Sequence, residues 1–220
     1  MRTRSLSLFS AALVPGLALA LGLACGGGSH TAAPAPAPAP APAASGLVYT
    51  DPAGTGWRLV KDASSTTTKI VLNLVGPAGL KTRGVGFNLQ APAGVKFAAF
   101  SNGLPILDSG VYQLTAAGST DPSEPLAITG GVKKGNLLSV GIYQKDRDQP
   151  AQDSGATLCQ IALQFDATAA LSTGTTLSLS IPKAKVIPED IGAVTDDAWT
   201  LDKKMRMTDI SIAVGTLTAH

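Results

Sequence analysis

Residues 156–165 read Ala-Thr-Leu-Cys-Gln-Ile-Ala-Leu-Gln-Phe, a run in which apolar side chains recur at every second position. The apolar residues at these alternate, odd-numbered positions are Cys159, Ile161, Leu163 and Phe165. Gln160 and Gln164 have the opposite parity. Successive side chains of a β-strand point to opposite faces, so this run predicts a strand with one buried and one solvated face.

The same period of two recurs along the chain. The other alternating runs are 69–75, 84–90, 137–144, 177–181 and 210–214. Turn sequences such as Asn102-Gly103 separate these runs at short intervals, and no segment has the pattern of a long amphipathic helix. We therefore expect an all-β fold, a two-sheet antiparallel sandwich of the jelly-roll type with about nine strands.

The first residues have the features of an export signal. Arg2 and Arg4 precede an apolar run over 6–23, and small residues follow it. The alternative is a transmembrane anchor, but the run is near the lower length limit for spanning and contains Pro15-Gly16. We expect residues 1–24 to be a signal peptide.

The end of that segment reads Leu-Gly-Leu-Ala-Cys-Gly over 21–26. This junction resembles a bacterial lipobox, in which a small residue precedes the cysteine that receives a lipid. The resemblance implies cleavage after Ala24, a covalent lipid on Cys25 and, since Gly26 replaces the Asp typical of inner-membrane retention, anchoring in the outer membrane. The side of that membrane stays open, and the alternative is a cysteine that merely ends an ordinary secretory signal.

Residues 25–45 predict a tether between this anchor and a domain over 46–220. Gly-Gly-Gly-Ser at 26–29 is followed by alternating Ala and Pro over 33–43, and neither composition can bury a core. An extended Pro-rich chain rises about 3.1 Å per residue, so this tether is expected to reach roughly 60 Å.

Three runs in the domain share further features. Residues 84–95 read Gly-Val-Gly-Phe-Asn-Leu-Gln-Ala-Pro-Ala-Gly-Val, 135–142 read Gly-Asn-Leu-Leu-Ser-Val-Gly-Ile, and Gly155 precedes the run 156–165. Their order, over about 69–187, resembles cohesin domains, which share a nine-strand jelly-roll sandwich with cellulose-binding modules. The resemblance implies a binding domain rather than a catalytic one. Unlike cellulosomal cohesins, this chain has a tether and no dockerin repeat.

Charge and residue types argue against two classes of function. Loss of Arg2 and Arg4 with the signal would leave 15 basic and 15 acidic residues, without the positive charge that nucleic-acid binding needs. The two histidines are His30 in the tether and His220 at the end of the sequence, so the domain core lacks the usual group for acid–base catalysis. Cys159 has the same parity as the apolar residues of its strand, so its thiol is expected in the core and not at a site of nucleophilic catalysis. We expect a protein that is not an enzyme.

Two surfaces are candidates for binding. Ser139, Gly141 and Tyr143 have the parity opposite the apolar residues of their run, so we expect them on an outer sheet face that meets a partner protein. The alternative is a carbohydrate-binding module for polysaccharide, whose stacking platforms would be Trp57, Tyr112 and Trp199. A passive structural envelope lipoprotein is the remaining alternative.

One charged loop offers oxygen ligands. Asp146, Asp148 and Asp153 are of the type that Ca²⁺ prefers, but Lys145 and Arg147 interleave with them. We therefore expect a solvated hairpin tip without a metal, and no cofactor other than the covalent lipid on Cys25.

Overall fold

The computed structural model describes residues 38–114, 132–133, 136–144, 150–188 and 207–220. The chain divides into two units, Met1–Ala39 and Pro40–His220. The described part of the second unit consists of β-strands, connecting segments and one short 3-10 helix, η1 (Ala167–Ala169). The all-β prediction is therefore confirmed. Within the described residues, no helix is long and apolar enough to cross a membrane.

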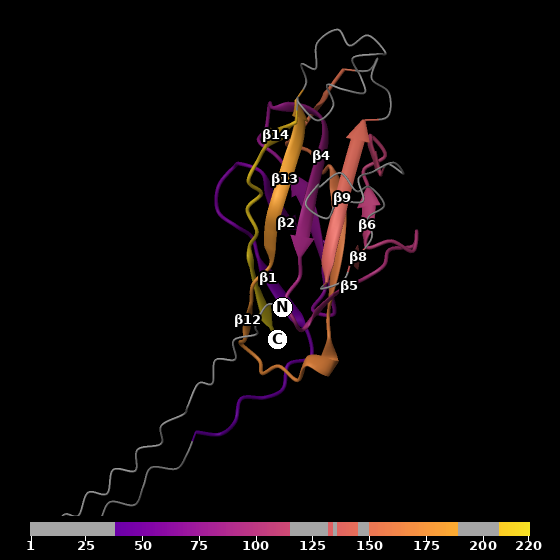
Figure 1. Ribbon diagram of the computed structural model, residues 1–220. Helices are drawn as coiled ribbons and strands as arrows, with labels where there is room; N and C mark the ends of the chain where they lie inside the picture. Colours follow the sequence, from indigo (N-terminus) through magenta and orange to yellow (C-terminus); the bar gives the residue numbers. More distant parts are fainter. Residues whose placement is uncertain (1–37, 115–131, 134–135, 145–149, 189–206) are drawn as a thin grey trace, which may run out of the picture. The chain divides into compact units, whose positions relative to one another are not determined.

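The largest sheet has seven antiparallel strands (Figure 1). Its main path runs through β14 (Thr208–Asp209), β13 (Ser180–Pro188), β4 (Lys81–Gln90), β9 (Leu137–Gln144) and β7 (Tyr112–Leu114). Two short strands complete it, since β10 (Gln152–Asp153) pairs with β4 and β8 (Val132–Lys133) pairs with β9. The long strands β4, β9 and β13 form its centre.

The second sheet has five strands, and a third has three. The five-stranded path is β2 (Arg58–Lys61), β3 (Lys69–Val75), β11 (Cys159–Phe165) and β5 (Val95–Phe97), with β6 (Ile106–Asp108) also paired to β11. The three-stranded sheet has the order β1 (Leu47–Thr50), β15 (Thr216–Ala219) and β12 (Thr176–Leu177). All these pairings are antiparallel.

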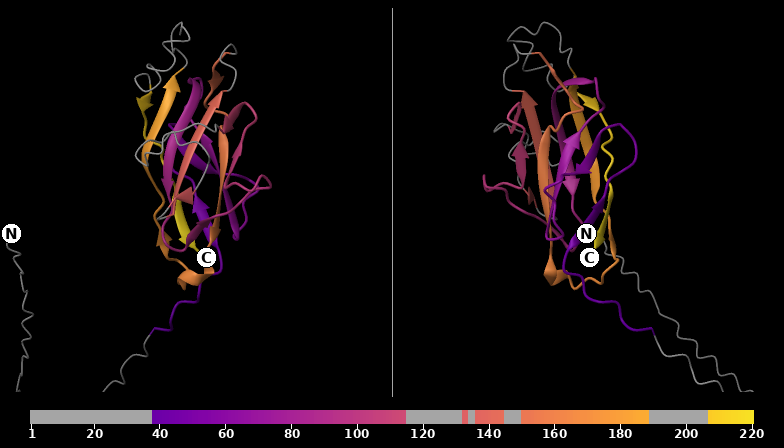
Figure 2. Two further views of the ribbon diagram at one scale, coloured as in Figure 1. Left: turned by 45° about the vertical axis from the view of Figure 1, so that its right-hand side comes forward. Right: turned by 180° about the vertical axis from the view of Figure 1, so that it is seen from behind.

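The two larger sheets bury their apolar faces in one core, and their strands are seen as two layers in Figure 2. Alternating residues of β3, β4, β9 and β11 are fully buried: Leu72, Leu74, Val85, Phe87, Leu89, Leu138, Val140, Ile142, Cys159, Ile161 and Leu163. The sandwich and its inner faces are thus as the alternation predicts, because a strand with one apolar face is stable only when that face is covered.

The number of strands differs from the expected nine, since the described residues alone form fifteen. Among the additional strands, β8, β10, β12 and β14 have two residues each. So short a strand shows no alternation of its own. It is defined by hydrogen bonding to a partner strand, and for β10, β12 and β14 that partner is distant in the sequence, so a local pattern does not contain it.

The C-terminal segment closes one edge of the sandwich. Ile210 N donates to the Ala184 carbonyl on β13, and Ala213 both accepts from Leu59 N on β2 and donates to the Trp57 carbonyl. The segment therefore connects the seven-stranded sheet to the five-stranded one before it enters β15. Closure of this kind protects sheet edges from pairing with other chains.

The end of the Ala-Pro tether is part of the folded unit. Thr173 N donates to the Pro42 carbonyl, and Ala44 N donates to the Leu171 carbonyl. Ser45 N and Gly46 N both donate to the His220 carbonyl, beside β1 and β12 (Figure 1). The folded unit thus begins at Pro40, a few residues before the expected boundary at Gly46, and the tether enters it next to the C-terminus.

Candidate functional site

The predicted protein-binding residues lie on the outer face of the seven-stranded sheet, opposite the core residues of β9. Contrary to expectation, however, Ser139 is only 1% exposed, Gly141 is buried, and Tyr143 is partly buried. Burial raises the pKa of the Tyr143 hydroxyl. Strand parity determines the face to which a side chain points, but not whether that face is covered. The prediction that these three residues form an open surface is wrong for Ser139 and Gly141.

The predicted aromatic platforms are not exposed either. Trp57 is 7% exposed and Tyr112 is 2% exposed, and both belong to the core. The Tyr112 hydroxyl donates to the Thr82 carbonyl at 2.6 Å. Trp199 lies outside the described residues. The prediction of exposed stacking platforms is therefore wrong for Trp57 and Tyr112. Both large side chains fill the interior of the sandwich, and the Tyr112 hydroxyl is hydrogen-bonded to the backbone there.

The charged loop is described only at its end. The Asp153 carboxylate accepts from Gly79 N at 2.9 Å and from Gly155 N at 2.7 Å, so it holds two turns together. Asp146 and Asp148 lie outside the described residues. Among the residues that are described, no three acidic, His or Cys side chains are grouped as metal ligands would be.

The cysteine of the domain is placed as predicted. Cys159 is fully buried on the inner face of β11, and burial raises the pKa of its thiol to about 12. A thiol with that pKa is a poor nucleophile at neutral pH, because the thiolate is the reactive form. Cys25 lies outside the described residues.

A polar cluster lies on the outer face of the five-stranded sheet. It comprises Asp62, just after β2, Asn73 on β3 and Gln160 on β11, and we call it the Asp62 network. Asp62 Oδ2 accepts from Asn73 Nδ2 at 2.8 Å and from Gln160 Nε2 at 3.2 Å. Gln160 Nε2 also donates to Asn73 Oδ1 at 2.9 Å. The network thus joins three neighbouring chain segments across the sheet.

The other oxygen of Asp62 stabilises the β2–β3 connection. Asp62 Oδ1 accepts from Ser64 Oγ at 2.6 Å and from Ser64 N at 2.9 Å. The Ser64 hydroxyl is the largest of the influences that lower the pKa of Asp62, and the Asn73 amide adds to it. The carboxylate is therefore ionised at neutral pH and accepts four hydrogen bonds, so its geometry is held before any partner arrives.

The surroundings of the network are partly exposed. Val60, Asn73, Gln160 and Leu107 follow one another across four paired strands, and each is partly exposed. Two rows away on β11, the side chain of Gln164 is exposed. Amide and aliphatic groups on a partly exposed sheet face can make hydrogen bonds and apolar contacts with another protein, whereas these four side chains include no nucleophile or proton-transfer pair.

A pocket of about 620 Å³ lies elsewhere, where β4 turns into β5. Its lining comprises Gln90, Ala91, Pro92, Ala93, Gly94, Val95, Lys96, Asn136 and Asp166. Gly94 has a φ of +88°, which side chains rarely adopt, and a Cβ at this position would also clash with the Leu171 side chain. The turn that forms one wall therefore requires glycine.

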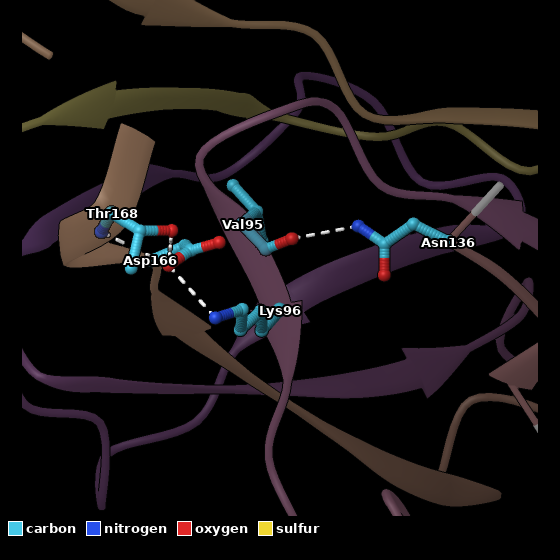
Figure 3. Close-up of polar contacts among 5 residues, drawn as sticks. All are labelled: Val95, Lys96, Asn136, Asp166 and Thr168. Atoms are coloured by element: carbon cyan, nitrogen blue, oxygen red, sulfur yellow. Dashed lines mark hydrogen bonds and ion pairs between the residues drawn. The ribbon is translucent and has the colours of Figure 1, made fainter. Parts of the chain in front are cut away.

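Lys96, Asn136 and Asp166 come from three segments and line this pocket. Figure 3 shows two sets of contacts, one between Asn136 and Val95 and the other joining Lys96 and Thr168 to Asp166. Asn136 Nδ2 donates to the Val95 carbonyl at 2.7 Å. Lys96 Nζ pairs with Asp166 Oδ1 at 2.8 Å. Thr168 donates to the same Asp166 oxygen through N at 3.1 Å and Oγ1 at 2.7 Å. The Lys96 hydrogen bond, followed by that of the Thr168 hydroxyl, lowers the pKa of Asp166, which is therefore ionised at neutral pH.

Sequence reasoning misses both the Asp62 network and the pocket. Local signals exist for parts of them: Asp62-Ala-Ser-Ser is typical of a turn closed by an aspartate side chain, and Gly135-Asn136 is typical of a left-handed turn residue. Asn136 indeed has a φ of +62°. These signals identify turns, but not the residues from other strands that meet them.

Comparison of the chain with protein-family models, with curated proteins and with solved structures finds no match.

Proposed function

We propose that this protein is a lipid-anchored, non-enzymatic recognition module of the bacterial envelope, and that it binds a partner protein through the outer face of the five-stranded sheet. The observation that carries the proposal is the Asp62 network. A carboxylate and two amides are held in fixed positions on a partly exposed face, so little side-chain entropy is lost when a partner binds.

The position of the tether supports this assignment. The tether enters the folded unit beside His220, at the level of the three-stranded sheet, and is hydrogen-bonded there. The backbone hydrogen bonds that residues 42–46 make at this end of the unit involve Leu171, Thr173 and His220, and none of them involves a residue of the Asp62 network. Anchoring in the outer membrane through a lipid on Cys25 is part of the proposal and rests on the lipobox-like sequence.

The character of the titratable groups supports a binding role. The thiol of Cys159 is buried and protonated, and the carboxylate of Asp62 is satisfied by four donors. Neither is prepared for nucleophilic attack or proton transfer. An ionised carboxylate that accepts four hydrogen bonds is suited instead to hold the neighbouring side chains of a surface in fixed positions.

We also propose that the sandwich is cohesin-like. The three runs that carry this resemblance form β4 with its following turn, β9 and β11, which are central strands of the two larger sheets. Their placement supports a shared arrangement of strands. The cohesin-like fold would itself be a binding scaffold, and it does not determine which partner is bound.

Site-specific photocrosslinking tests the partner face. The full chain, purified in detergent, would carry a photoreactive amino acid at exposed Gln164 and, as a matched control, at exposed Thr216 on the outer face of β15. With envelope proteins from the same bacterium, we expect a discrete crosslinked protein from position 164 and not from position 216.

The Asp62 network is then tested directly. Gln160→Ala removes the amide that connects β11 to Asp62, and we expect it to weaken binding of the crosslinked protein about tenfold. Thr216→Ala should leave binding unchanged. Equal crosslinking from both faces, or binding unaffected by Gln160→Ala, would show that this face is not the recognition surface.

A further inference from the structure

The pocket beside Pro92 has hydrogen-bonding groups that its own contacts do not use. Asp166 Oδ1 accepts three hydrogen bonds, one from Lys96 and two from Thr168, and no described residue donates to Oδ2. Both amide hydrogens of Asn136 are directed to backbone carbonyls, those of Val95 at 2.7 Å and Ala91 at 3.4 Å. Within the described residues, no hydrogen bond is made to Asn136 Oδ1, so this oxygen can accept one from a ligand. Figure 3 shows the contact of the Asn136 amide with the Val95 carbonyl.

Lys96 supplies donors to the same pocket. Its ammonium group has three hydrogens, of which the contact with Asp166 takes one, and its side chain is 51% exposed. The pocket therefore presents acceptors from Asp166 and Asn136 together with free donors from Lys96. Ala91, Pro92 and Ala93 add an apolar wall.

The charges in the pocket favour neither anions nor cations. Lys96 and Asp166 neutralise each other at 2.8 Å, so an anion would face the carboxylate and a cation would face the ammonium group. A neutral hydroxyl can join the pair without breaking it, because it both donates and accepts. Several hydroxyls on a ring with an apolar C–H face would match the polar groups and the wall together.

We infer that this pocket is a binding site for a neutral saccharide, held by Lys96, Asp166 and Asn136 and packed against Pro92. A volume of about 620 Å³ is within the usual range for small-ligand sites and suits about one or two sugar rings. The site is separate from the proposed partner face, and it needs none of the buried aromatic rings.

Titration of the full chain in detergent with cellobiose, maltose and chitobiose tests the inference. The reporters are the NMR signals of the Asn136 side-chain amide and of the Gly94 and Lys96 backbone amides. We expect at least one disaccharide to shift these signals in a saturable way, while glycerol at the same concentration does not. Absence of shifts with every disaccharide at about 10 mM, or equal shifts with glycerol, would overturn the saccharide assignment.

Two matched variants test the role of the ion pair. Lys96→Met keeps the length of the side chain but removes the donors, and we expect the dissociation constant to rise roughly tenfold. Lys185→Met breaks the other described ion pair, Lys185 with Asp209 on β14, and should bind as the wild type does. Unchanged binding by Lys96→Met, or equal weakening in both variants, would contradict the assignment. Unaltered thermal midpoints would confirm that both variants are folded.

Discussion

Gly84 of β4 lies directly opposite Tyr143 of β9, and a Cβ on Gly84 would come within 2.7 Å of the Tyr143 ring. The aromatic ring thus covers the glycine on the outer face of the seven-stranded sheet. This relationship explains part of the burial of Tyr143, whose parity alone predicts a solvated side chain. It also makes the glycine a necessary part of the packing at this point of the sheet.

Replacing Gly84 by Ala is expected to lower the free energy of unfolding by about 1–3 kcal/mol. The added methyl group would also lie 2.7 Å from the Ile142 carbonyl oxygen, so rotation of the Tyr143 ring alone cannot relieve the contact. Urea denaturation measures the change. Gly56→Ala is the control, since a Cβ there has no neighbour within 4 Å, and equal stability of the two variants would contradict the close packing.

Asp62→Asn is expected to destabilise the domain by about 1–2 kcal/mol at neutral pH and to reduce its sensitivity to acid. Hydrogen bonds lower the pKa of Asp62 in the folded state, so its ionised form contributes stability above the unfolded pKa of about 3.9. That contribution is lost as the pH falls through the folded pKa. Denaturation midpoints measured between neutral and acid pH should therefore decline less in the variant than in the wild type.

The control for this experiment is Asp209→Asn, because the Asp209 side chain is 79% exposed and makes one ion pair. Exposed ion pairs contribute little, so its acid profile should follow that of the wild type. If Asp62→Asn also followed the wild type, the Asp62 network would not be formed in solution.

Stability is expected to fall in alkali. Burial raises the pKa of Cys159 from 9.0 to about 12, and those of Tyr49 and Tyr112 from 10.0 to about 12. Below the unfolded pKa values both states hold these protons. As the pH rises above them, the unfolded state releases protons first, so the free energy of unfolding decreases.

Cys159→Ala isolates one of these contributions. Between about pH 9 and about pH 12 the wild type should lose about 1.4 kcal/mol per pH unit through this thiol, and the variant should lack that part of the slope. The slope is the measurement, because the substitution also changes the stability at neutral pH. A thiol that reacts rapidly with Ellman's reagent in the native wild type would contradict its burial.

Cys25→Ser is expected to move the protein from the membrane fraction to the soluble fraction, because the hydroxyl cannot take the lipid that the lipobox-like sequence implies. Cys159→Ser is the matched control and should stay with the membrane. Fractionation of cells followed by immunoblotting gives the distribution. An unchanged membrane fraction for Cys25→Ser would refute lipidation at this position.

The sequence by itself determined the class of fold and the inner faces of the central strands. The period of two in β4, β9 and β11 requires that the apolar face of each strand be covered. Because no segment of the sequence has the pattern of a long amphipathic helix, the cover is expected to be a second sheet. The core positions of Phe87, Val140 and Cys159 follow from parity alone. The burial of the Cys159 thiol follows from the same parity.

Only the tertiary structure decided which outer positions are open and which polar groups meet. Asp62 is 11 residues from Asn73 and 98 from Gln160, and no local pattern connects them. Asn136 meets Val95 in the same way, across 41 residues. Ser139 has the parity of a solvated residue and is buried, because coverage depends on chain segments brought together by long-range pairing. The alternation of apolar and polar residues determines the face of the sheet on which a side chain lies. The residues that this side chain contacts are determined by the order of the strands and the register of their pairing.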